Sequence, residues 1–161
     1  MEQILAIFTN HILIAATFSW LICQISKFII TAIVEKQWRF ERLVGDGGMP
    51  SGHSATVTAM TVMCGYLYGL DDPIFAIAFL LAIIVMHDAT GVRREAGKHA
   101  VTLLQLIDAF NEVVSEKDKL AQQEKLKVFV GHTPVQVFFG SIVGALTSII
   151  YILVFQVVGI F

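Results

Sequence analysis

The sequence predicts an all-α fold: one integral membrane helical bundle of about four transmembrane helices, with an added amphipathic helix. Composition is the first observation, because 56% of the 161 residues are hydrophobic and only 15% are charged. Soluble domains have roughly 45–50% apolar and about 25% charged residues. The mean hydropathy of +0.74 agrees. The second observation is that the few charges leave long stretches of the chain uncharged.

The same numbers exclude several classes of protein. The 11 Lys and Arg residues against 13 Asp and Glu leave a net charge of −2, which argues against a nucleic-acid partner. The low charge content also argues against a disordered chain, a coiled coil or a soluble enzyme with a polar shell. At this length we expect a single membrane domain over residues 1–161.

The first and last predicted spans, residues 4–34 and 135–160, are the longest. Between Gln3 and Val34 the ionisable side chains are His11, Cys23 and Lys27, and residues 135–161 hold no formal charge over 27 positions. A helix that crosses a bilayer needs about 20 mainly apolar residues. Both segments therefore exceed that requirement.

The middle spans, residues 54–70 and 73–88, are shorter. Asp71, Asp72 and Pro73 are all that joins them, so the pair is typical of a helical hairpin. With the outer spans this gives four crossings.

An amphipathic insertion is predicted over residues 99–127. Its apolar residues recur at intervals of three and four, which is typical of one helix face. We expect it to lie in the membrane interface or on the bundle, with dimerisation or a lid over the site as the alternative. The residues of this stripe are Leu103, Leu106, Ile107, Phe110, Val113 and Val114.

Basic residues predict the orientation in the membrane. Ten of the 11 Lys and Arg residues fall in segments 35–50 and 89–134, and the remaining one, Lys27, lies in the first span. Two crossings separate these segments, so they share one side, which the positive-inside rule makes cytoplasmic. We expect a protein of the bacterial cell membrane with its polar segments on the cytoplasmic face.

The first polar segment, residues 45–53, runs into the second span. Pro50 and Ser51 suit a helix start, and the glycines let backbone N–H groups approach an anion. A helix N-terminus favours phosphate, and His53 falls in the first turn. The alternative is a glycine-rich turn with a serine cap and an incidental histidine.

The second polar segment, residues 87–94, follows the third span. Arg93 and Arg94 suit a bidentate clamp on phosphate oxygens, and Asp88 suits the orientation of an Arg or His. The alternative is a pair of positive-inside anchors.

The third polar segment, Gly131-His132-Thr133-Pro134, opens the last span, and alternation of crossings brings all three segments to one face. Two His and two Arg without a Cys/His cluster at metal spacing indicate metal-free phosphoryl chemistry with no cofactor. One His would attack phosphorus and the other would protonate the leaving oxygen. Gly140 and Gly144 suit close helix packing.

These motifs carry a resemblance to a known superfamily. Residues 49–55, Met-Pro-Ser-Gly-His-Ser-Ala, resemble the central motif of the type 2 phosphatidic acid phosphatase superfamily, which is related to the vanadium haloperoxidases. His132, Gln136-Val137, Gly140 and Gly144 resemble its last motif in spacing. Over roughly residues 20–145 the chain is similar to the short, divergent bacterial branch.

The resemblance implies a role for each matching position. His132 corresponds to the nucleophile that forms a phosphohistidine, and His53 to the general acid for the leaving group. The phosphate binders that it implies are Ser51, Gly52, Arg93 or Arg94, and, from the first motif, Lys27, Arg39 and Arg42.

Two departures from the superfamily pattern keep alternatives open. Arg93 stands six residues before His99, the superfamily's usual spacing to its nucleophile, so His99 rivals His132. His99 lacks the downstream motif, which favours His132. Gln136 occupies the position of an Asp that would orient the nucleophile and stabilise its charged form.

Two functions from different classes follow. The first is a phosphatase that hydrolyses a phosphate or diphosphate monoester, with a lipid-linked substrate as its partner in the membrane. The second, favoured by Gln136, is a non-catalytic protein that binds or moves phospholipid head groups. A serine hydrolase built on Ser51 or Ser54 lacks recognisable oxyanion donors. A homo-oligomer would be a further partner.

Overall fold

The computed structural model describes residues 5–36, 38, 48–113 and 131–159. Within these ranges the regular structure is helical and no strand is found, which confirms the predicted all-α class. The elements, in chain order, are the 3₁₀ turn η1 (Ala6–Thr9) and the helices α2 (His11–Glu35), α3 (Gly52–Tyr68), α4 (Pro73–Thr90), α5 (Val92–Val113) and α6 (Pro134–Val158).

Helix α2 begins at His11, later than the start near residue 4 expected from the uncharged stretch. Asn10 sets this boundary, because its side-chain oxygen accepts hydrogen bonds from the backbone N–H groups of Ile12 and Leu13 at 3.0 and 3.2 Å. Such an N-cap satisfies backbone donors that have no partner within the helix. The short turn η1 precedes it.

Helices α3 and α4 form the hairpin that the Asp-Asp-Pro turn predicted. Gly69 ends α3 with φ of +97°, a backbone conformation that favours glycine. The Asp72 carboxylate then accepts from the Ile74 N–H at 2.7 Å, and Pro73 is the first residue of α4.

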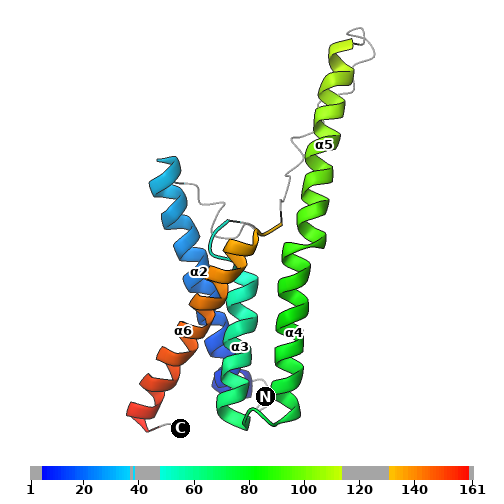
Figure 1. Cartoon of the computed structure of the whole chain (residues 1–161). Helices are drawn as coiled ribbons and strands as arrows, with labels where there is room; N and C mark the ends of the chain where they lie inside the picture. Colours follow the sequence, from blue (N-terminus) through cyan, green and yellow to red (C-terminus); the bar gives the residue numbers. More distant parts are fainter. Residues whose placement is uncertain (1–4, 37, 39–47, 114–130, 160–161) are drawn as a thin grey trace.

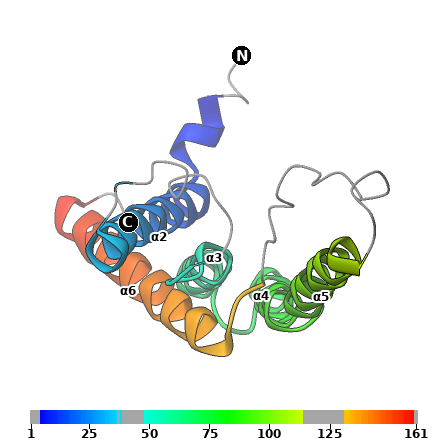
Figure 2. The same ribbon diagram turned by 90° about the horizontal axis from the view of Figure 1, so that it is seen from above.

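Helix α3 is the centre of the bundle and contacts α2, α4 and α6 (Figures 1 and 2). The approach of α6 is closest at Gly140 and Gly144. A Cβ atom at Gly140 would collide with the Ser51 carbonyl oxygen, and one at Gly144 with the Ala55 carbonyl oxygen. Small residues at these two positions therefore let the backbones of α3 and α6 touch.

Three helices in the described part of the chain are long and apolar enough to cross a membrane. They are α2, the rod formed by α4 and α5, and α6. Their outer faces expose large apolar side chains, as expected where lipid replaces water. Helix α3 has 17 residues, about 25 Å of helix, and packs against α2, α4 and α6.

Helix α5 continues the line of α4 past Gly91 and projects beyond the bundle (Figure 1). The predicted amphipathic insertion therefore starts earlier, at Val92, and its described part contacts α4. Residues 114–127 of that insertion lie outside the described residues. Much of the predicted stripe is exposed, namely Leu103, Leu106, Phe110 and Val113.

Candidate functional site

The three polar segments meet at one end of the bundle. The first turn of α3, the last turn of α4 and the first turn of α6 all lie at the end from which α5 projects (Figure 1). The antiparallel alternation of α3, α4 and α6 produces this convergence, as expected from the order of the spans in the sequence.

Two histidines face each other there. The imidazole rings of His53, on α3, and His132, just before α6, have centroids 5.7 Å apart and planes inclined at 64°. His132 is 4% exposed and His53 is half-buried. Residues 79 positions apart in sequence thus form one imidazole pair.

His132 is held in place through the backbone of the α4–α5 rod. Its N–H donates to the Ala89 carbonyl oxygen at 3.0 Å. The preceding Gly131 lies against the backbone of Arg93 and Arg94, where a Cβ atom would collide with the Arg94 nitrogen. A glycine is required at that position because no side chain fits between the two backbones.

Gln136 determines which nitrogen of His132 carries a proton. Its Oε1 accepts from the Thr133 N–H at 3.0 Å and lies 3.2 Å from His132 Nδ1. An oxygen acceptor requires His132 Nδ1 to be the donor. In the neutral ring the lone pair is then on Nε2, the nitrogen that can act as a nucleophile.

The same glutamine belongs to the cap of α6. The Thr133 hydroxyl accepts from the Gln136 N–H at 3.3 Å, which completes a reciprocal capping box with the bond from the Thr133 N–H. The Gln136 carbonyl also accepts from the Ser51 N–H at 3.0 Å, so it joins the starts of α3 and α6.

Ser51, a predicted phosphate binder, is fully buried as the N-cap of α3. Its hydroxyl accepts from the Ser54 N–H at 3.3 Å and lies 3.0 Å from the Ser54 hydroxyl. These bonds fix the first turn of the helix, whose remaining N–H groups favour an anion.

Lys27 reaches the start of α3 from α2 and is 5% exposed. Its Nζ donates to Gln24 Oε1 at 2.7 Å, and it would lie 3.8 Å from a Cβ atom placed on Gly52. A cation beside a helix N-terminus adds to its attraction for an anion. The structure therefore brings Lys27, Gly52, His53 and His132 to one end of the bundle.

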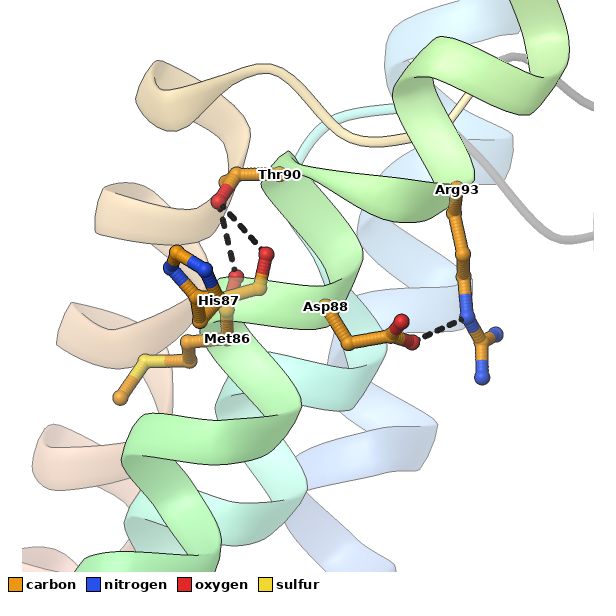
Figure 3. A network of polar contacts seen from close by, with 5 residues as sticks. All are labelled: Met86, His87, Asp88, Thr90 and Arg93. Atoms are coloured by element: carbon orange, nitrogen blue, oxygen red, sulfur yellow. Dashed lines mark hydrogen bonds and ion pairs between the residues drawn. The ribbon is translucent and has the colours of Figure 1, made fainter.

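The arginines take other positions. Arg93 Nε donates to Asp88 Oδ2 at 2.7 Å across the α4–α5 junction, with the Arg93 side chain 56% exposed (Figure 3). Asp88 thus orients an arginine, and the contacts described for Arg93 are with Asp88 instead of the histidines. The backbone of Arg94 contacts Gly131, and its side chain is half-buried.

Three other predicted residues lie elsewhere. Arg39 and Arg42 are outside the described residues. His99, the rival nucleophile, is exposed on α5, two turns beyond the junction with α4.

Two further residues of α2, Trp20 and Gln24, lie near the start of α3 and were not expected there from the sequence. With Lys27 they follow the spacing i, i+4, i+7, which places them on one helix face. That spacing was the available signal, but the apolar residues around it concealed the pattern.

The arrangement suits chemistry on a phosphate group. One imidazole with a nucleophilic nitrogen, a second imidazole able to carry a proton, and a buried ammonium beside a helix N-terminus provide attack, proton transfer and charge stabilisation.

Comparisons with known proteins identify the family. The sequence model of a family described as "Divergent PAP2 family" matches residues 8–147. The chain is 40% identical over 148 residues to the "Uncharacterized membrane protein YuiD" of Bacillus subtilis (strain 168), covering 88% of this chain and 94% of that protein. No solved structure matches.

Proposed function

The chain belongs to the divergent PAP2 family, and from that premise we propose that it is a membrane phosphatase acting on a lipid-linked phosphate or diphosphate monoester. The observation that carries the proposal is the imidazole pair, with ring centroids of His53 and His132 5.7 Å apart beside the start of α3. Lys27 and Gly52 supply the neighbouring anion-binding groups.

In the first step His132 is the nucleophile. The lone pair on its Nε2 attacks phosphorus while the bond from phosphorus to the ester oxygen breaks. His53, protonated at the start, gives its proton to that oxygen, so the lipid leaves as a neutral alcohol. From a diphosphate the leaving group is the lipid monophosphate. His132 then carries the phosphoryl group as a phosphohistidine.

In the second step water replaces the histidine. His53, now neutral, takes a proton from the water as its oxygen attacks phosphorus. The P–N bond breaks, its electron pair returns to His132 Nε2, and inorganic phosphate is released. Both histidines are then in their starting states, so the cycle needs no further reactant.

Charge on the phosphoryl oxygens is stabilised by groups fixed before the substrate arrives. Lys27 is buried and held by Gln24, and its ammonium lies beside Gly52, the first residue of α3. Arg93 or Arg94 contributes to the clamp if the substrate draws a guanidinium away from Asp88. The site lies at the cytoplasmic face, following the distribution of basic residues.

The test is phosphate release from phosphatidate or a polyprenyl diphosphate by the purified protein in lipid nanodiscs. His132→Ala is expected to lower the rate about a thousandfold or more, as removal of a nucleophile does. His53→Ala is expected to lower it by about 10²–10⁴. His99→Ala is the matched control, because His99 is exposed on α5.

Equal phosphate release by the wild type and His132→Ala would overturn the proposal. If His99→Ala were the inactive variant instead, the assignment of the nucleophile would be wrong. Acid-labile labelling of the wild type from a ³²P-labelled substrate, absent in His132→Ala, would support the phosphohistidine.

A second candidate function rests on Gln136. A neutral amide orients His132 but cannot stabilise a positively charged ring as a carboxylate does. A protein that binds or moves phospholipid head groups would need His132 to be oriented but would not need its positively charged form to be stabilised. An inert wild type that binds lipid phosphate and gains turnover as Gln136→Glu would favour this function over the phosphatase.

A further inference from the structure

Trp20 lies at the border between the buried and the exposed faces of α2. Its side chain is 40% exposed, and its neighbours on the buried side are Ala16, Cys23 and Gln24. Along the helix axis Trp20 is seven residues, about 10 Å, deeper in the bilayer than Lys27. It therefore touches both the interior of the bundle and the surrounding lipid.

The polar edge of the indole ring faces the first residue of α3. A Cβ atom placed on Gly52 would lie 3.3 Å from Trp20 Cδ1 and 3.6 Å from Nε1. These are adjacent atoms of the five-membered ring, so the N–H edge is the part nearest the helix start. The Lys27 ammonium lies on the same side, 3.8 Å from that point.

The Trp20 side chain adds a hydrogen-bond donor beside the start of α3, and no acceptor for it is described. The indole N–H can only donate, and in the described part of the chain it has no hydrogen-bond partner. Tryptophan N–H groups usually find a hydrogen-bond partner when they are buried. The groups that surround it, the N-terminus of α3 and Lys27, attract an anion. An anionic oxygen would accept from the indole N–H and would also be attracted by Lys27 and by the N-terminus of α3.

We propose that Trp20 is a substrate-binding residue whose indole N–H donates to a non-bridging oxygen of the lipid phosphate. Its exposed ring contacts the first methylene groups of the hydrocarbon chain. The substrate class is thus a phosphate monoester on a long hydrocarbon, reached from the bilayer along α2. The inference rests on the proposed function only in requiring that this site binds phosphate.

Fluorescence gives a direct test, because the chain has two tryptophans, Trp20 and Trp38. In the Trp38→Phe variant Trp20 is the only tryptophan, so selective excitation of tryptophan reports on it alone. Titration with dodecyl phosphate is expected to shift its emission in a saturable way. Inorganic phosphate should shift the Trp20 emission only at higher concentration. Dodecanol, which lacks the phosphate, should give no saturable shift.

Each result of the titration decides something. Bound radiolabelled dodecyl phosphate without any change in Trp20 emission would overturn the inference. Equal half-saturation by inorganic phosphate and dodecyl phosphate would overturn the contact with the chain. A response to dodecanol equal to that of dodecyl phosphate would overturn the contact with phosphate.

The Trp20→Phe substitution tests the contribution of the indole N–H to binding separately from that of the aromatic ring. Trp20→Phe keeps an aromatic ring and removes the donor, so the dissociation constant of dodecyl phosphate is expected to rise about tenfold. In turnover, KM should rise by a similar factor with kcat nearly unchanged. Trp38→Phe is the matched control.

The phosphatase function and the substrate-binding role of Trp20 can be refuted independently. A wild type without turnover that still gives the Trp20 response would refute the phosphatase and leave the role of Trp20 standing. An active wild type whose KM is unchanged in a folded Trp20→Phe variant would do the reverse. If Trp20→Phe does not fold, the titration of native Trp20 decides alone.

Discussion

At the scale of single residues, Gln136 links more parts of the site than any charged group described around it. Its side-chain oxygen orients His132 and accepts from Thr133, and its carbonyl accepts from the Ser51 N–H. The Asp expected at this position from the superfamily pattern would be one methylene shorter and would carry a negative charge. The amide supplies orientation without charge.

Substitution of Gln136 should separate orientation from charge. Gln136→Glu keeps the capping box and adds a carboxylate beside Nδ1, so turnover is expected to rise about tenfold or more, because the charge favours the positively charged ring. Gln136→Met removes the acceptor and should lower turnover by a similar factor. Phosphate release at saturating substrate measures both. A Glu variant slower than the wild type would contradict the assigned role.

Gln24 provides a second prediction at this scale. Gln24→Glu keeps the acceptor for the Lys27 ammonium but adds a negative charge next to the anion site, so vanadate inhibition should weaken about tenfold. If Gln24 served only to hold Lys27 in place, Gln24→Glu would be as stable as the wild type and would keep its inhibition, whereas Gln24→Met would be less stable. Thermal unfolding of both variants provides the control, and unchanged inhibition in Gln24→Glu would exclude Gln24 from the site.

Much of the site could be predicted from sequence because helix starts have local signals. Ser51 and the Thr133-Pro134 pair begin helices where expected, and alternation of crossings brings His53 and His132 together. The positions of Trp20 and Gln24 could not be predicted, because they depend on which face of α2 meets α3. The pairing of Arg93 with Asp88 likewise depends on how α5 continues from α4 at Gly91.

At the scale of elements, the contact between α3 and α6 positions the two histidines. Its two closest points, at Gly140 and Gly144, bring the α6 backbone against carbonyl oxygens of α3. The uncharged stretches located these helices, and the small residues four apart indicated their packing. The continuation of α4 into the projecting α5 was not evident, because an amphipathic pattern does not give a helix its direction.

Alanine at these glycines should push the helices apart. Gly144→Ala is expected to lower the free energy of unfolding by about 1–3 kcal/mol, the usual cost of overpacking. Gly140→Ala, at the Ser51 carbonyl, should also reduce turnover because it displaces the start of α3. Leu146→Ala on the exposed face is the control. Reversible unfolding in detergent measures each, and equal stability of Gly144→Ala and the wild type would contradict the close contact.

At the scale of the whole molecule, the polar end and the α3–α4 turn lie at opposite ends of the bundle (Figure 1). The turn holds Asp71 and Asp72 and no basic residue, while α5 carries Lys98 and extends from the polar end. From the positive-inside rule we therefore expect α5 and the histidines to lie on the cytoplasmic side.

Cysteine labelling in intact cells tests this orientation. The native Cys23 and Cys64 are buried and should not react with a membrane-impermeant maleimide. Asp71→Cys is expected to be labelled in intact cells, and Lys98→Cys only after permeabilisation. The reverse pattern would place the site on the outer face and would direct the search for substrates to that leaflet.

The capping box of α6 has one further consequence. The Gln136 oxygen that closes the first turn of the helix is the same atom that sets the proton on His132. In the proposed mechanism, formation of the first turn of α6 therefore also orients His132 as the nucleophile. Conversely, we expect fraying of that turn to remove the acceptor of His132 Nδ1 without unfolding the other helices. Heat or detergent should thus abolish chemistry before it abolishes helix content.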